Sequence, residues 1–180
     1  MFIKYFDIII VESWFYMENS NYIFTSKNII FKQVSKDYIS DYLLMINDIE
    51  IASKISKNIC TYTYEDEVKW VEEKIKENDL VFTMVEKSTG DFIGNIEIMK
   101  VINKVGEIGI SLAKSKQNKG YGSEAISSLM EYGKTTLGIN SFELNVYVTN
   151  PRAIRCYEKV GFIKSGEGKN KESIHMTCIM

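Results

Sequence analysis

Proline, histidine and arginine are scarce in this 180-residue sequence, which has one proline, one histidine and two arginines. Pro151, Arg152 and Arg155 all lie in the C-terminal half, and no glycine occurs before Gly90. Glycine permits backbone conformations with positive φ, proline presets φ, and arginine binds oxyanions in a forked geometry. We therefore predict a ligand site in the C-terminal half of the chain.

An excess of basic charge is also absent. The 22 basic and 24 acidic residues give a formal net charge of -2 at pH 7. Duplex nucleic acid and anionic membranes select proteins that carry a strong positive field. We therefore expect neither a nucleic acid nor a membrane as a direct partner.

Cysteine is limited to Cys60, Cys156 and Cys178, which form no C-x-x-C pair. An odd number of cysteines without paired spacing predicts neither a disulfide framework nor a zinc site. A reducing compartment suits such a chain. We expect a cytoplasmic protein with free thiols and no metal.

Long apolar runs are missing even from the opening residues 1–16, because Asp7 and Glu12 interrupt them and no small-residue cleavage site follows. This stretch is predicted to be neither a signal peptide nor a membrane span. It is either an extra edge strand or an N-terminal extension before a natural start at Met17, and we favour the extension. Residues 17–180 are expected to form a single domain around one core.

The first half of that domain predicts one strand and two helices. The strand covers residues 28–34, and Ser35 is the candidate N-cap of a helix that ends near Asn47. Thr63 and Asp66 predict a capping box at the start of the second helix. Residues 49–62 between the helices have no clear period, so we predict a loop that faces the substrate.

The second half predicts strands first, then strands alternating with helices. An antiparallel meander is followed by a helix that ends at Gly138, and a later short helix has Asn150 as its cap and Gly161 beyond its end. The expected strands are residues 80–87, 92–101, 106–113, 142–148, 162–165 and 174–179, and the expected long helix is residues 123–137. This order predicts an α/β (α+β) fold in which a mixed sheet carries helices on its faces.

A glycine-containing loop, residues 117–122 (QNKGYG), lies between a predicted strand and a predicted helix. Its two glycines let consecutive backbone N–H groups turn inward around an anion, and the helix N-terminus adds partial positive charge. Lys114, Lys116 and Lys119 add further positive charge. The loop is a candidate pyrophosphate site, although a loop that needs glycine only for its turn has the same pattern.

Two other phosphate motifs fit these residues less well. A P-loop ending at Thr135 would need glycine in place of Ser128, so it is excluded. Residues 120–125 match G-x-G-x-x-A, but polar residues separate them from the preceding strand, and no acidic residue closes the next strand. A dinucleotide-binding oxidoreductase is therefore not favoured.

A second segment, residues 150–162 (NPRAIRCYEKVGF), follows the next predicted strand. Together with residues 117–122, it closely resembles the two signature segments of the GNAT N-acetyltransferase superfamily, in the same order and context. The resemblance covers residues 28–180. Residues 106–110 and 120–125 are most similar to the branch with ribosomal-protein N-terminal acetyltransferases, whereas residues 150–162 are also similar to polyamine and aminoglycoside acetyltransferases.

The resemblance implies a GNAT fold, with a mixed, mostly antiparallel sheet of six to seven strands and about four helices on its faces. It also implies acetyl-CoA as the cosubstrate, with the pyrophosphate on the glycine loop and the pantetheine along a splayed strand. Asn150 is expected to cap the helix whether or not it also contacts the cofactor. Arg152 and Arg155 are candidates for the CoA phosphates, although exposed arginines are often simply solvated or paired. The implied cofactor-binding residues are Ile110, Leu112, Gln117, Asn118, Lys119, Gly120, Tyr121, Gly122, Ser123, Asn150, Arg152 and Arg155.

The resemblance further implies direct transfer, in which an unprotonated amine attacks and the CoA thiolate leaves. Tyr157 occupies the family position that protonates the thiolate; its alternative role is packing on an apolar helix face. A base is needed because an alkylamine is mostly protonated at neutral pH. Glu107 is favoured over Glu97, and either is alternatively a polar residue on an open sheet face.

The acceptor amine is left open by the sequence. A peptide or ribosomal-protein N-terminus is favoured over a polyamine or an aminoglycoside. Ser111 stands where some aminoglycoside-modifying relatives carry a carboxylate, which counts against that substrate. A non-catalytic acyl-CoA-binding module is the other interpretation, and we expect a monomer or a homodimer.

Overall fold

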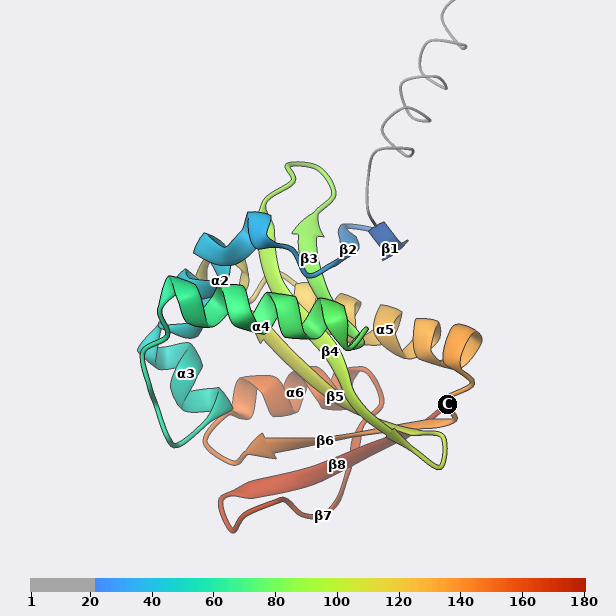
Figure 1. Cartoon of the computed structure of the whole chain (residues 1–180). Coiled ribbons are helices and arrows are strands. Elements are labelled where there is room, and N and C mark those ends of the chain that lie inside the picture. The colour runs from blue at the N-terminus through green and yellow to red at the C-terminus, as the bar shows by residue number, and fades with distance from the viewer. Residues whose placement is uncertain (1–21) are drawn as a thin grey trace, which may run out of the picture.

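Eight strands form one sheet in the order β1-β2-β3-β4-β5-β6-β8-β7 (Figure 1). The computed structural model describes residues 22–180, so the predicted extension at residues 1–16 and a start at Met17 lie outside the described residues. Strand β5 pairs with β6 in parallel, and every other neighbouring pair of described strands is antiparallel. The strands are β1 (Tyr22–Thr25), β2 (Ile29–Gln33), β3 (Val81–Glu86), β4 (Phe92–Ile102), β5 (Val105–Leu112), β6 (Ser141–Tyr147), β7 (Ile163–Glu167) and β8 (Ser173–Ile179).

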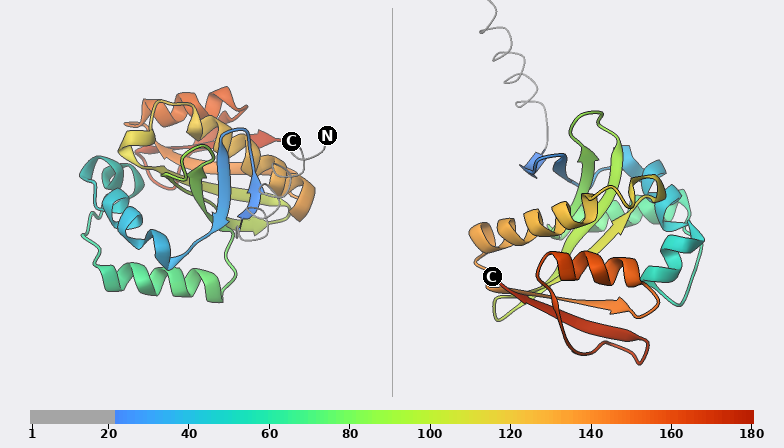
Figure 2. Two further views of the ribbon diagram at one scale, coloured as in Figure 1. Left: turned by 90° about the horizontal axis from the view of Figure 1, so that it is seen from above. Right: turned by 180° about the vertical axis from the view of Figure 1, so that it is seen from behind.

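Helices cover both faces of this sheet. Figure 2 shows α2 and α4 on one side and α5 and α6 on the other. The helices are α2 (Ile39–Ile46), α3 (Ile49–Ile55), α4 (Tyr64–Lys76), α5 (Tyr121–Leu137) and α6 (Pro151–Lys159), with short 3-10 turns η1 (Lys36–Tyr38) and η2 (Lys114–Lys116). The predicted mixed α/β class is confirmed, but residues 22–180 form eight strands instead of six to seven and five α-helices instead of about four.

Helix α3 corrects the prediction that residues 49–62 form a loop. Its first turn is capped by the Asp48 side chain, which accepts hydrogen bonds from the N–H groups of Glu50 and Ile51 at 2.8 and 3.3 Å. The helix has only seven residues and buries only Ile51 and Ala52. Two turns are too short for a periodic apolar pattern to stand out, so the sequence did not reveal this helix.

Local signals at the helix ends are confirmed. Thr63 and Asp66 form a reciprocal capping box at the start of α4. The Asn150 side chain accepts a hydrogen bond from the Ala153 N–H, and Pro151 is the first residue of α6. Gly138, in the left-handed region at φ 67, closes α5. These caps satisfy helix-end backbone groups that have no partner inside the helix.

The main core lies between the sheet and the face covered by α5 and α6. Its members from these helices pack against inward-facing side chains of β2, β3, β4, β6 and β8. A smaller cluster joins α2 and α4 through Ile39, Tyr42 and Val71 on the opposite face. The fully buried large side chains include Phe31, Tyr42, Met84, Ile96, Ile126, Leu129, Phe142 and Phe162. The α5 and α6 face is therefore well packed, and the start of α5 is buried at Tyr121.

Candidate active site

Strands β5 and β6 separate part-way along their length. Their parallel ladder joins Val105 to Ser141, Gly106 to Phe142 and Glu107 to Glu143, and stops there. Strand β5 continues to Leu112 while paired only with β4. The splay predicted from the family resemblance therefore exists, and it opens directly after Glu107.

The alternation of hydrogen bonds along β5 decides which backbone groups face this opening. Ala113 donates to the Ile93 carbonyl of β4 at 2.9 Å, and the antiparallel register pairs Ser111 with Asn95 and Gly109 with Glu97. In such a ladder, every second residue bonds to the same neighbour. The backbone groups of Ile110 and Leu112 therefore point toward β6, where the ladder has ended. The Leu112 carbonyl accepts from the Gln117 side chain at 2.9 Å, which leaves the Ile110 N–H and C=O without a strand partner.

The loop that follows β5 presents a row of backbone donors. Asn118 and Gly120 both have positive φ, 61° and 88°. Alternating right- and left-handed residues turn successive N–H groups into one concavity, which is a known anion-binding shape. Within the described chain, the N–H groups of residues 118–123 donate to no internal acceptor, and Gly120 is the N-cap of the 17-residue helix α5. The helix dipole adds to this anion site.

The two loop glycines serve different needs. A β carbon at Gly120 would meet nothing within 4 Å, so its left-handed backbone is what requires glycine. At Gly122, a β carbon would lie 3.2 Å from the Cys156 Sγ of α6. Gly122 therefore allows α5 and α6 to pack closely while its N–H stays available at the helix end.

The three loop lysines contribute unequally. Lys116 is held away from the loop, because its Nζ lies 2.7 Å from Glu86 Oε2 and 2.9 Å from Asp91 Oδ2. Lys114 pairs with Glu50 at 2.9 Å. Lys119 has no ion pair within the described chain, so it is the loop lysine available to a bound anion.

The side chains of Tyr121 and Ser123 both make hydrogen bonds within the protein. The Tyr121 side chain is buried and donates to Glu86 Oε1 at 2.5 Å, and the Ser123 hydroxyl donates to the Gly120 carbonyl at 3.0 Å. Hydrogen bonds from Lys116 and then Tyr121 lower the pKa of Glu86 to about 2. Tyr121 can therefore reach a cofactor only through its backbone, whereas the hydroxyl proton of the partly exposed Ser123 is already donated to Gly120.

Helix α6 packs against the first turn of α5, where Cys156 faces Gly122. Arg152 and Arg155 are exposed and have no ion pair within residues 22–180. The half-buried Tyr157 packs on the main core and against the Phe162 ring, with centroids 5.9 Å apart. Burial raises the pKa of Tyr157 above its usual value, so the hydroxyl stays protonated near neutral pH. That hydroxyl makes no hydrogen bond to a described residue, so its proton is not committed elsewhere.

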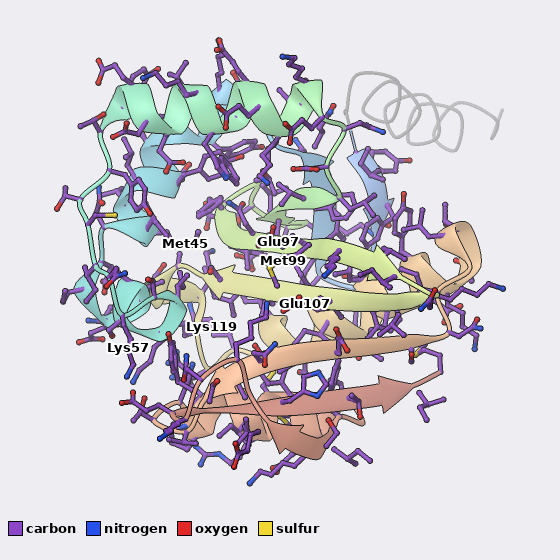
Figure 3. The ribbon with its side chains drawn as sticks, turned by 60° about the horizontal axis from the view of Figure 1, so that its bottom comes forward. Met45, Lys57, Glu97, Met99, Glu107 and Lys119 are labelled. Atoms are coloured by element: carbon purple, nitrogen blue, oxygen red, sulfur yellow. The ribbon has the colours of Figure 1, made fainter. Side chains whose placement is uncertain are left out.

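Glu97 lies on the sheet face opposite α5 and α6, together with Glu107 (Figure 3). Its side chain crosses Gly109 of β5, where a β carbon would sit 2.8 Å from Glu97 Oε1. Burial, opposed by Lys74, raises the pKa of Glu97. The carboxylate borders a pocket of about 210 Å³ and makes no hydrogen bond within the described chain. It is therefore a desolvated carboxylate whose oxygens are available.

Glu107 is in a different environment, although it lies on the same face. Its Oε1 accepts from Lys169 Nζ at 2.6 Å and from Asn145 Nδ2 at 3.2 Å. Its side chain is 10% exposed. The two candidate bases are therefore distinguished by their partners: Glu107 is in an ion pair, and Glu97 is not.

His175, the single histidine, takes part in a separate contact on β8. Its Nδ1 is 2.8 Å from the Ser165 hydroxyl, and its Nε2 is 3.4 Å from Glu143 Oε2. Within residues 22–180, no group of three or more histidine, cysteine, aspartate or glutamate side chains is placed to hold a metal ion. No helix of that part of the chain is long and apolar enough to cross a membrane.

A model of the acetyltransferase (GNAT) domain matches residues 28–163. This chain belongs to the GNAT acetyltransferase family. As a GNAT enzyme it is an acetyl-CoA-dependent N-acetyltransferase, which the sequence predicted. The ribosomal-protein branch remains a prediction.

Relatives of this GNAT acetyltransferase act on different amines. Spermidine N(1)-acetyltransferase of Vibrio cholerae is 30% identical over 120 residues, which cover 62% of this chain and 69% of that protein. Human alpha/beta-tubulin-N-acetyltransferase 9 is 39% identical over 59 residues, which cover 32% of this chain and 28% of that protein. The crystal structure of spermidine N-acetyltransferase from Vibrio cholerae with CoA and spermine matches with a TM-score of 0.76 at 20% identity, covering 86% of this chain and 96% of that one.

Two residues that contact the candidate base Glu107, Asn145 and Lys169, were missed in the sequence. Asn145 lies between buried Leu144 and Val146 on β6, and this alternation marks it only as a residue of the open face. Lys169 lies in the β7–β8 loop, 62 positions from Glu107. No local sequence pattern predicts the contact between Lys169 and Glu107, because only the order of the strands in the sheet brings them together.

Proposed function

We propose that this GNAT acetyltransferase acetylates a small primary amine that carries a second positive charge, of the polyamine class. The observation that carries the proposal is the pair of carboxylates, Glu97 and Glu107, on the open sheet face where β5 and β6 separate. A dication is attracted by two carboxylates in a partly desolvated site. The similarity to a spermidine N(1)-acetyltransferase supports the same acceptor class.

The residues on the donor side fit acetyl-CoA. When bound, acetyl-CoA supplies an acetyl thioester that an amine can attack and a thiolate that can leave. The free N–H groups of residues 118–123 and the Lys119 side chain suit a pyrophosphate. The Ile110 backbone groups suit pantetheine amides, or an N–H donor aimed at the thioester carbonyl oxygen. Arg152 and Arg155 are exposed close to the start of α6 and can neutralise further phosphate.

We assign the general base to Glu97, directly or through one water. A base must be unprotonated and must have an oxygen that is free to accept the ammonium proton. Glu97 meets the second requirement, and burial brings its pKa closer to neutral pH, which strengthens it as a base. The sequence favoured Glu107, but Lys169 and Asn145 already occupy Oε1 of that side chain.

We assign the general acid to Tyr157. Its raised pKa keeps the phenol protonated, so the Oη proton is available to a leaving thiolate. The side chain lies on the same core face as Ile110 and Leu112, whose backbone groups face the opening between β5 and β6. Tyr157 and Glu97 would therefore act from opposite faces of the sheet, through the opening between β5 and β6.

A peptide N-terminus is the second candidate acceptor. Exposed aromatic and aliphatic side chains gather between α3 and the start of α4, with Ile59, Tyr62 and Tyr64 exposed by 46%, 40% and 54%. Such a surface suits the side chains of a peptide. The similarity to a tubulin N-acetyltransferase supports this alternative, as does the sequence resemblance to ribosomal-protein acetyltransferases.

A cytoplasmic location and a monomeric or dimeric state belong to the same proposal. Cys60 is exposed, Cys156 is half-buried, and all three cysteines are free thiols. Free thiols are kept reduced in the cytosol, which supports that location. Light scattering on the purified full chain measures the oligomeric state, and an assembly larger than a dimer would contradict our expectation.

An acceptor screen tests the proposal. The full-length protein is incubated with acetyl-CoA and with polyamines, N-terminal peptides or aminoglycosides, and thiol release is measured. We expect the highest kcat/KM with polyamines. A higher kcat/KM with peptides would indicate that the acceptor is a peptide N-terminus. Binding of acetyl-CoA without thiol release in the presence of any amine would indicate a non-catalytic module.

A further inference from the structure

Lys169 places its ammonium group on one of the two acceptor-side carboxylates. Its Nζ lies 2.6 Å from Glu107 Oε1. The two partners differ in exposure: the Lys169 side chain is 65% exposed and the Glu107 side chain is 10% exposed. The Glu107 carboxylate is therefore part of the protein interior, whereas the Lys169 ammonium group approaches it from the solvent side. Another cation can therefore replace Lys169 beside Glu107.

Asn145 orients both members of this ion pair. Its Nδ2 donates to Glu107 Oε1 at 3.2 Å, and its Oδ1 accepts from the Lys169 backbone N–H at 3.1 Å. The loop itself is fixed by bonds between Ser173 and Asn170, including Ser173 N–H to the Asn170 carbonyl at 3.0 Å. The Lys169 backbone is therefore anchored, and only the long side chain needs to move to uncover Glu107.

We propose that Glu107 and Asn145 form the subsite for the second positive charge of the acceptor amine, and that Lys169 is a specificity-determining residue that occupies this subsite until the acceptor displaces it. This inference rests on the proposed function. The Lys169 ammonium has the same charge and the same hydrogen-bonding capacity as a protonated amine on an alkyl chain. It thus marks where such a group binds.

The spacing of the carboxylates suits such an acceptor. Glu97 crosses Gly109, and Glu107 lies two residues earlier on the same face of β5. Two residues of a strand span about 7 Å. This is comparable to the separation of two amines joined by a short alkyl chain, so one amine can meet the base while the other binds Glu107.

Displacing Lys169 costs little, because its side chain is 65% exposed and the ammonium group of the acceptor takes its place beside Glu107. Removing it has a different consequence. In a Lys169→Met variant, the mostly buried Glu107 carboxylate has no lysine beside it, and a buried charge without a partner is unfavourable. A dicationic acceptor places a positive charge beside Glu107 and no longer competes with the Lys169 ammonium group. The apparent affinity of the variant for such an acceptor therefore rises.

The test compares butylamine, which has one amine, with putrescine, which has two. Lys169→Met should lower KM for putrescine about three- to tenfold and leave KM for butylamine unchanged. Glu107→Gln should raise KM for putrescine about tenfold, with little effect on butylamine and with the low-pH limb of kcat unchanged. Lys169→Arg should keep the wild-type ratio of the two KM values.

Lys171→Met is the matched control. This lysine is exposed in the same loop and has no ion pair within the described chain. It should leave both KM values unchanged, and thermal melting confirms that each variant is folded. If the wild type acetylates amines but Lys169→Met does not change the ratio of the KM values, the subsite alone is overturned. If the wild type acetylates neither amine, the proposed function is overturned with it.

Discussion

Glu97 crosses the neighbouring strand at the one residue that leaves room for it, Gly109. A β carbon at Gly109 would lie 2.8 Å from Oε1 and 3.1 Å from Cγ of Glu97. We expect Gly109→Ala to push the carboxylate aside and lower kcat at least tenfold, with acetyl-CoA affinity within twofold of wild type. Steady-state kinetics and calorimetric titration measure the two quantities. Unchanged kcat in a folded Gly109→Ala protein would argue against Glu97 as the base.

Glu97→Gln should reduce activity and increase stability. The pKa of Glu97 is raised on folding, so its charged form is disfavoured and stability falls as pH rises from its unfolded to its folded pKa. Glutamine removes this unfavourable charge. We expect a Tm increase of about 1–3 °C at pH 7, which corresponds to less than about 1 kcal/mol in a domain of this size.

The same substitution should remove the low-pH limb of the kcat profile. That limb arises in the wild type because the base must lose its proton, and the raised pKa moves the limb toward neutral pH. The residual rate of Glu97→Gln should then vary little across the limb. A limb that persists unchanged would assign it to another group.

Tyr157→Phe should lower kcat about 100-fold, the scale of general acid catalysis, while acetyl-CoA affinity changes little. The phenyl ring keeps the packing against Phe162 and the core, so the fold and the cofactor site are retained. Thiol-release kinetics and direct titration of acetyl-CoA separate the two effects. Equal turnover in the variant would show that Tyr157 is a packing residue.

Gly120→Ala should weaken acetyl-CoA binding about tenfold, because alanine disfavours the left-handed backbone at φ 88 that turns the loop N–H groups inward. Gly120→Asn is the matched control, since asparagine tolerates this conformation and there is open space for its side chain. Calorimetric titration of acetyl-CoA measures both. Equal losses in the two variants would indicate that the side chain, and not the backbone angle, disturbs the site.

The Glu86–Lys116 contact should make stability depend on pH under acidic conditions. The folded-state pKa of Glu86 is lowered to about 2, so its stabilisation is present above its ordinary value of 4.5 and is lost as pH falls toward 2. Lys116→Met should lower Tm at pH 7, and the difference from wild type should shrink between pH 4.5 and 2. A difference that is constant over this range would contradict the assignment.

Much of the fold was predictable because its signals are local. Two helix starts are marked by capping residues that lie close together in the sequence, Thr63 with Asp66 and Asn150 with Pro151. The strands of the meander are also recognised from a few neighbouring residues, because their apolar and polar side chains alternate. Helix α3 is the exception, because its cap at Asp48 opens only seven residues. Strand β1 (Tyr22–Thr25) was not predicted, because it has only four residues and precedes the first predicted strand at residue 28.

The site was predictable only where it follows one segment of chain. Residues 117–120 form a loop at a helix start, as the glycines indicated, but α5 begins at Tyr121, two residues before the predicted helix 123–137. The different environments of Glu97 and Glu107 depend on Gly109, Asn145 and Lys169, which come from other strands and a distant loop. Sequence spacing carries no information about which carboxylate is in an ion pair, so the preference between them needed the structure.

Glu124 shows how a distant turn protects the anion site. It lies in the first turn of α5, yet its carboxylate accepts from the Ser26 hydroxyl at 2.6 Å and from the Asn28 N–H and side chain at 2.6 and 2.8 Å. An acidic side chain at a helix start often turns back onto the unpaired N–H groups of its own helix. Because the β1–β2 turn holds this carboxylate, the phosphate competes with no carboxylate from the helix that binds it.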